Sequence, residues 1–338
     1  MATSNIFARL AGALFGAQRG DPAADIDTGL LDDAVEAIVE AVEPRIRLVP
    51  RYRTKLAPIA TRAIRFMRTL APLLPPPIEL SRAAWSSDAY VGAFFATGND
   101  IDTLLSRDAA LDAFFADPAN VSRDAAHAVL VMRREERNVL ASAIVDGELR
   151  GDVAQTTIGF AAHRLFAVTA DADATRRAIG QAILERLAAL ALERIVATRE
   201  RASELDVRKS MLAARLRMLT LRRDSQKALA AAGESDASAE IAALQQQLKA
   251  TAADHLETKA SLATLDYSID QIETVLGEPQ QHLGIDTFDM RVSHTGYKLD
   301  AASSEPGSQL HLSELWIGAK LRAVIAPVYV PRAAVAQP

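Results

Sequence analysis

The chain has 338 residues, which is enough for two or three structural units. Its hydrophobic fraction of 49% includes 66 alanines, and only 5% of the residues are aromatic, so side chains that fill a large core are scarce. With a net charge of -5, the protein lacks the excess of basic residues typical of nucleic-acid-binding proteins, so we expect no nucleic-acid partner. The absence of cysteine excludes disulfides, thiolate metal sites and cysteine nucleophiles.

Residues 1–20 are expected to form a short amphipathic helix, because Phe7, Leu10 and Leu14 share one helical face. Arg9 interrupts the apolar stretch, which does not have the form of a secretory signal, and no run of eighteen apolar residues occurs anywhere. We therefore expect a cytoplasmic protein whose first helix docks on the protein itself. Binding of this helix to a membrane surface is the alternative.

Residues 1–122 are expected to form a helical domain in which an acidic helix precedes a basic one. The basic segment, 45–70, has an apolar face and no acidic residue, a pattern that also suits an anionic membrane surface. Because the preceding helix is acidic, we favour pairing between the two helices and keep the membrane as the alternative. The acidic residues are Asp32, Asp33, Glu36, Glu40 and Glu43, and the basic ones include Arg45, Arg47, Arg53, Lys55 and Arg68.

An internal repeat lies at the end of this domain. Residues 88–96 and 108–116 are identical at six of nine positions, and each copy begins with an aspartate and ends with paired phenylalanines. The aspartates are expected to cap two short helices. The phenylalanines, Phe94, Phe95, Phe114 and Phe115, are expected either to fill a shared core or to line an aromatic docking groove for a partner helix.

Two groups of strands are expected, one on each side of a long helical segment. Within residues 123–170, alternating apolar residues and the turn dipeptide Asp146-Gly147 predict a small antiparallel meander. Within residues 284–332, three strands are expected at 290–299, 310–317 and 321–330. Neither group is large enough to be stable alone, so we expect a single small antiparallel sheet that contains both.

Residues 171–278 are expected to form an antiparallel coiled-coil hairpin with its turn near 231–236. The second arm has an apolar seam at alternating spacings of three and four for five repeats. Segment 199–227 has a net charge of +5 and segment 234–278 a net charge of -7, which favours pairing of the two arms. The first-arm seam is Leu205, Leu212, Leu216 and Leu219, and the second-arm seam runs through Ile241, Leu244, Leu248, Thr251, His255, Thr258, Leu262, Leu265, Ile269, Ile272 and Leu276.

These elements predict a predominantly helical α+β fold, with a helical N-terminal domain, a small antiparallel sheet, and the long hairpin inserted between the two strand groups. No catalytic motif was found, so we expect no enzyme activity, no cofactor and no metal. His294 and His311 fall on adjacent expected strands, and the sequence leaves open whether they form a site. An enzyme with a site assembled from scattered Asp, Arg and His residues is the least favoured alternative.

The sequence therefore favours a non-enzymatic scaffold or adaptor that uses the coiled-coil arm for protein–protein interaction or self-assembly into a homo-oligomer. The hairpin within a β domain is similar in layout to the periplasmic adaptor subunits of efflux and secretion systems, which implies a peripheral membrane or envelope-associated adaptor as the alternative. The excess of arginine over lysine suits a GC-rich bacterial genome. The expected interaction residues are the four repeat phenylalanines, the four first-arm seam leucines, Leu262 and Ile269.

Overall fold

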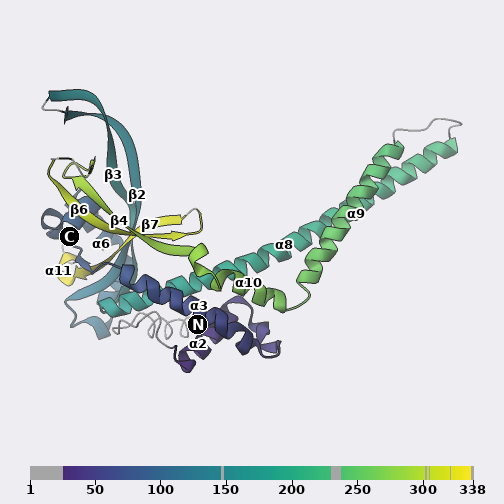
Figure 1. The fold of residues 1–338 in the computed structure, drawn as a ribbon, viewed down its shortest axis with the longest axis horizontal. Coiled ribbons are helices and arrows are strands. Elements are labelled where there is room, and N and C mark those ends of the chain that lie inside the picture. Colours follow the sequence, from purple (N-terminus) through teal and green to yellow (C-terminus); the bar gives the residue numbers. More distant parts are fainter. Residues whose placement is uncertain are drawn as a thin grey trace. The chain divides into compact units, whose positions relative to one another are not determined.

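The computed structural model describes residues 26–145, 148–229, 237–300, 303, 305–319 and 321–335. The N-terminal amphipathic helix, the Asp146-Gly147 turn and the hairpin turn near 231–236 lie outside these residues. Over the described residues the chain is a predominantly helical α+β protein with a long helical segment between two groups of strands, as the sequence predicts (Figure 1).

One seven-stranded sheet contains both strand groups, in the order β3-β2-β7-β6-β4-β5, with β1 pairing to β7. Pairing of β2 with β7, from Ala125 opposite Pro331 to Met132 opposite Val324, joins the groups. All neighbours along this order are antiparallel, and β1 pairs in parallel. The strands are β1 (Ile78–Glu79), β2 (Ala125–Val145), β3 (Glu148–Thr169), β4 (Leu283–Ser293), β5 (Lys298–Leu299), β6 (Gly307–Ile317) and β7 (Leu321–Pro331).

Two strand predictions were wrong in detail. In place of a meander of short strands, β2 and β3 form one hairpin, with strands of 21 and 22 residues. Up to Met132, β2 pairs with both β3 and β7; the described part of β2 beyond Met132 pairs with β3 alone. In place of a strand over 290–299, β4 ends at Ser293. Gly296, with φ of +83°, makes the turn that separates β4 from β5, and this conformation is open to glycine without a steric cost.

The two edges of the sheet meet at one point. Thr157 of β3 forms a bridge with Tyr297, and the Ile158 N–H donates to the Gly296 carbonyl oxygen at 2.8 Å. The sheet therefore curves enough for its first and last strands to touch.

Four short helices pack on this sheet: α4 (Ala84–Ser87), α5 (Ala89–Phe94), α6 (Gly98–Arg107) and α7 (Ala109–Ala116). Asp88 accepts hydrogen bonds from the backbone N–H groups of Tyr90 and Val91, and Asp108 accepts one from Leu111, so both repeat aspartates are helix caps. The helices and the sheet share one hydrophobic core. Remaining short elements are η1 (Pro44–Leu48), η2 (Ala71–Leu73), η3 (Pro118–Asn120), η4 (Pro279–Gln281) and α11 (Arg332–Val335).

By compactness the chain divides into two units, and each is described by itself. Unit 1 comprises Met1–Ala34, Thr61–Glu185 and Glu278–Pro338, and includes the sheet with α4–α7. Unit 2 comprises Val35–Ala60 and Arg186–Gly277. The three-domain organisation expected from the sequence stays a prediction; the structure adds that α4–α7, expected in a separate helical domain, share their core with the sheet.

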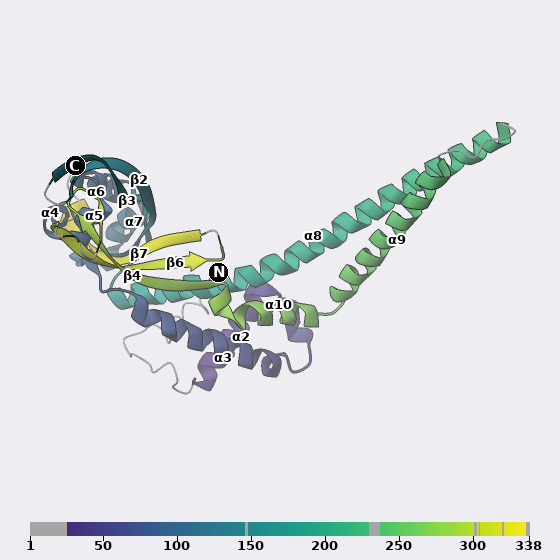
Figure 2. The ribbon, with the colours of Figure 1, turned by 45° about the horizontal axis from the view of Figure 1, so that its top comes forward.

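Unit 2 is helical. Its elements come from α2 (Thr28–Val42), α3 (Tyr52–Leu70), α8 (Ala172–Leu229), α9 (Ala237–Ser261) and α10 (Asp266–Leu276). The distal part of α8 and α9 lie side by side as the antiparallel hairpin arm (Figures 1 and 2). The buried residues at its base are Val35, Ile38, Val39, Val42, Ile46, Leu56, Leu187, Ala191, Ile195, Ile269, Ile272 and Leu276.

The second arm is broken, where the seam predicts a continuous helix. α9 ends at Ser261 and α10 begins at Asp266. At the end of α9, the Thr258 hydroxyl donates to the Asp254 carbonyl oxygen and the Ser261 hydroxyl to that of Thr258, both at 2.8 Å.

Candidate functional site

The repeat phenylalanines lie in or against the core of unit 1. Phe94 and Phe95 are each 2% exposed; Phe94 packs edge-to-face on Phe160, and Phe95 stacks on His163. Phe114 and Phe115 are half-buried, and the Arg332 guanidinium lies 4.4 Å from the centre of the Phe115 ring. Burial leaves Phe94 and Phe95 no surface to offer to a partner helix.

The expected seam residues lie between the arms. Ile241 and Leu244 are each 5% exposed and Ile269 is 6% exposed, while Leu262 and the first-arm leucines Leu205, Leu212, Leu216 and Leu219 are half-buried. Their low exposure is what the seam predicts for side chains between the two arms.

A polar layer interrupts this seam. The Lys209 Nζ donates to the His255 Nδ1 at 3.3 Å, and the His255 Nε2 lies 3.8 Å from the Asp206 Oδ1. The hydrogen bond from Lys209 holds the pKa of Asp206 below its ordinary value. Sequence reasoning assigned His255 to the seam but missed Lys209, which lies four residues after Leu205 and three before Leu212.

A second apolar stripe runs along α8 on the side away from this seam. Val207, Met211, Ala214, Met218 and Leu221 repeat at spacings of four and three, which is again a heptad pattern. They are displaced by two residues from the seam, or about 200° around a helix, and so face the opposite direction. We call this set the outer stripe. Its large members are 58% (Val207), 68% (Met211), 70% (Met218) and 68% (Leu221) exposed.

Arginines flank the outer stripe. Arg208, Arg215, Arg217 and Arg222 occupy positions next to its apolar residues and are all exposed. Arg215 pairs with Glu240 of α9 at 2.8 Å. At the basal end a shallow groove of about 480 Å³ is lined by Glu200, Ser203, Glu204, Val207, Arg208 and Met211. The stripe is thus an exposed apolar surface with a mainly basic border.

The acidic and basic helices at the base of unit 2 pair with each other. Arg47 bonds to Glu36 and Glu40, and Arg53 bonds to Glu36. Glu43, only 7% exposed, receives hydrogen bonds from Arg45 at 2.9 Å and 3.0 Å and from Arg199 of α8 at 2.7 Å. Four basic side chains of segment 45–55 therefore form ion pairs within the protein: Arg45, Arg47, Arg53 and, with Asp266, Lys55.

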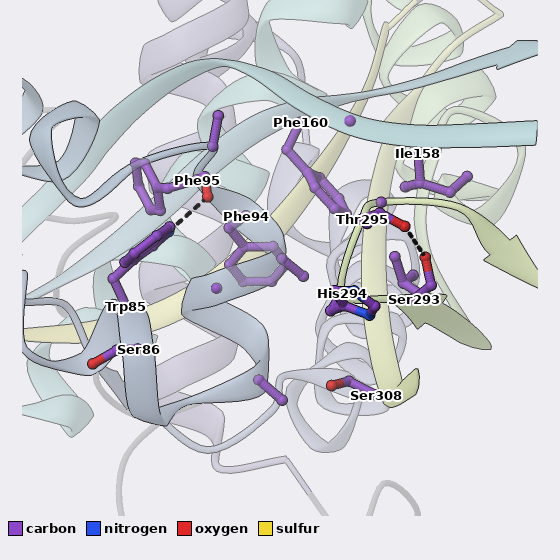
Figure 3. A pocket seen from close by; sticks show the side chains of 17 residues that line it. Trp85, Ser86, Phe94, Phe95, Ile158, Phe160, Ser293, His294, Thr295 and Ser308 are labelled. Carbon is purple, nitrogen blue, oxygen red and sulfur yellow. Dashed lines mark hydrogen bonds between the residues drawn. The ribbon is translucent and has the colours of Figure 1, made fainter. Parts of the chain in front are cut away.

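Unit 1 holds a pocket of about 650 Å³ at the place where the sheet edges meet (Figure 3). One wall is α4–α5, with Trp85 and Phe94; another is β3, with Ile158 and Phe160. The turn after β4 and the start of β6 supply Ser293, His294, Thr295 and Ser308. This pocket was not expected from the sequence, because its walls come from four separate parts of the chain.

The sequence left open whether His294 and His311 form a site, and the structure places them in different surroundings. His294 lies in the turn after β4 and lines the pocket, whereas His311 lies on β6 with its Nδ1 2.9 Å from the Asp289 Oδ1. Among the described residues no group of three or more His, Asp or Glu side chains is arranged to hold a metal ion.

The fold and these surfaces define an α+β protein with a helical hairpin arm. In comparisons with known proteins, no family model, no curated protein and no solved structure matches this chain. Within the described part of the chain, none of the helices combines the length and the apolar character needed to cross a membrane.

Proposed function

We propose that this protein is a non-enzymatic adaptor whose hairpin arm binds another protein. The observation that carries the proposal is the outer stripe. The seam already satisfies the packing of the two arms, yet α8 presents four further large apolar side chains, each more than half exposed, at heptad spacing. A heptad stripe is the surface that a second helix packs against, and exposing it to water is unfavourable.

The border of the stripe argues for an acidic partner. A helix lying along the outer stripe would place its flanking positions beside Arg208, Arg215, Arg217 and Arg222. Glutamate or aspartate at those positions would be complementary to this border, whereas basic residues would be repelled. We therefore propose as partner an amphipathic helix of another protein, apolar on one face and acidic beside it.

Self-association through this surface is less favourable. Two outer stripes packed on each other would bring the same arginines together in both copies, and like charges oppose such contact. The homo-oligomer expected from the sequence therefore stays a prediction that the experiment below also examines. The cytoplasmic location, the absence of enzyme activity and the envelope-adaptor alternative also stay predictions.

A peptide-binding experiment tests the proposal with the full chain. The probe is a labelled four-heptad helix with leucine at its seam positions and glutamate beside them, and its counterpart has lysine in place of glutamate. Fluorescence anisotropy should show binding of the glutamate peptide about tenfold or more tighter than that of the lysine peptide, with an affinity that falls as salt rises.

Variants identify the surface. Met211→Glu with Met218→Glu should reduce binding of the glutamate peptide about tenfold, because the apolar contact is lost and the partner is repelled. Leu256→Glu is the matched control: Leu256 is 71% exposed on α9 but lies off the outer stripe, so binding should not change. Equal binding of the two peptides, or equal effects of the two variants, would overturn the proposal. Concentration-dependent dimers in sedimentation that the double variant abolishes would assign the stripe to a second copy instead.

A further inference from the structure

We propose that the pocket of unit 1 binds a small uncharged aromatic molecule. The inference rests on three observations: the hydrogen bonds within the pocket walls, the small side chains on α5, and the residue types that line the pocket. It is independent of the arm.

Hydrogen bonds hold the walls of the pocket in place. The Trp85 Nε1 donates to the Phe95 carbonyl oxygen at 2.9 Å, which orients the indole ring at one side (Figure 3). On the opposite side, the Ser293 N–H donates to the Tyr297 carbonyl oxygen at 2.8 Å and the Gly296 N–H donates to that of Ser293 at 3.0 Å. The volume of about 650 Å³ lies within the range of about 300–1,000 Å³ typical of ligand sites.

Small side chains on one face of α5 leave this space open. Ala89 and Ala93, four residues apart on this face, line the pocket together with Gly92, and Ala96 lines it just beyond the end of the helix. On the other side of the helix, Val91 is buried in the core. The helix therefore places a larger side chain toward the core and small side chains toward the pocket.

The lining of the pocket lacks acidic side chains and the basic side chains of Lys and Arg, and it includes aromatic rings. None of its seventeen residues is Asp, Glu, Lys or Arg, although these types make up 24% of the chain. Burying a charged ligand here would be costly, because no Asp, Glu, Lys or Arg side chain of the lining is available to pair with it. The rings of Trp85, which is 37% exposed, and of half-buried Phe160 can make edge-to-face or stacked contacts with another aromatic ring.

A few polar groups give the ligand an orientation. The Ser308 hydroxyl and the His294 imidazole line the same pocket, across from Phe94 (Figure 3). A ligand with one or two hydrogen-bonding groups on an aromatic frame would match them, in the usual pattern of an apolar site with few polar anchors.

Two probes that differ by one charged group test whether the pocket prefers an uncharged aromatic ligand. N-phenyl-1-naphthylamine is uncharged, and 8-anilino-1-naphthalenesulfonate has the same ring system with a sulfonate. Titration of the full-length protein should give saturable binding of the uncharged probe at one site, about tenfold or more tighter than binding of the sulfonate at that site. Energy transfer should quench the emission of Trp85, read in a Trp316→Phe background.

The internal repeat supplies matched variants. Ala89→Leu and Ala93→Leu extend side chains into the pocket and should weaken binding of the uncharged probe about tenfold. Ala109→Leu and Ala113→Leu make the same changes at the equivalent positions of α7, which does not line the pocket, and should leave binding unchanged. Ala89 and Ala109 are both exposed, so these two substitutions carry little risk to folding.

The proposal fails if the two probes bind with equal affinity, if the uncharged probe does not bind, or if the α5 and α7 variants change binding alike. Loss of binding in Ala89→Leu with an unchanged melting temperature supports it.

Discussion

Replacing Glu43 by glutamine removes the charge that ties the start of η1 to α8 within unit 2. The Glu43 side chain is 9% exposed and accepts hydrogen bonds from two arginines, Arg45 and Arg199. The two hydrogen bonds from Arg45, followed by the one from Arg199, lower the pKa of Glu43 from 4.5 to about 2, against the opposing effect of burial. The carboxylate therefore favours the folded state while it is ionised.

The size and the sign of this effect follow from the pKa difference. A shift of this size corresponds to at most about 3 kcal/mol of folding free energy. Because the pKa is lower in the folded state, this stability is present above the unfolded pKa of 4.5 and is lost as the pH falls toward about 2. About 2 kcal/mol of it should be gone by about pH 3.

Urea unfolding followed by far-UV circular dichroism measures this contribution, since the long helices of unit 2 dominate that signal. Between neutral pH and about pH 3, the wild-type protein should lose about 2 kcal/mol more than Glu43→Gln does. Glu40→Gln is the control; its one ion pair with Arg47 is more exposed, so it should cost less than about 1 kcal/mol. A Glu43→Gln protein with the same pH dependence as the wild type would refute the reasoning.

Three further substitutions test other parts of the fold. Phe94→Ala removes a ring that is 2% exposed and should cost about 3–5 kcal/mol in urea unfolding monitored by tryptophan fluorescence. Gly307→Ala places a Cβ 2.8 Å from the Val292 carbonyl oxygen, so it should lower the melting temperature of unit 1 in calorimetry. Lys209→Leu combined with His255→Leu replaces the polar layer of the arm with an apolar pair and should raise the thermal midpoint of the helical signal; no change, or a decrease, would contradict this role.

The hairpin was predictable from a local pattern, and the combined sheet from the small size of each strand group. Alternating spacings of three and four from Ile241 to Leu276 marked the second arm, and buried or half-buried side chains occur at every one of those positions. The sheet followed from the argument that neither strand group was large enough alone. The break between Ser261 and Asp266 was missed, because no glycine or proline marks it and the apolar spacing continues across it.

The two candidate surfaces show different limits of sequence reasoning. The outer stripe is present in the sequence at heptad spacing. It was overlooked because the leucine seam of the same helix, two residues earlier in each repeat, gives a stronger pattern. A search for two seams in α8 would have found Val207, Met211, Met218 and Leu221. The pocket was beyond such a search, since it depends on the meeting of Ile158 with Gly296, which are far apart in the chain.

Site-specific photocrosslinking in the cells that make the protein tests the proposed role of the arm most directly. A p-benzoyl-phenylalanine residue replaces Met218 on the outer stripe in one sample and Leu256 on α9 in the other, and mass spectrometry identifies the crosslinked peptide. We expect the Met218 position alone to be joined to an acidic amphipathic helix of another protein. Adducts formed equally from both positions, adducts only to a second copy of this chain, or no adduct from the Met218 position would contradict the proposed function.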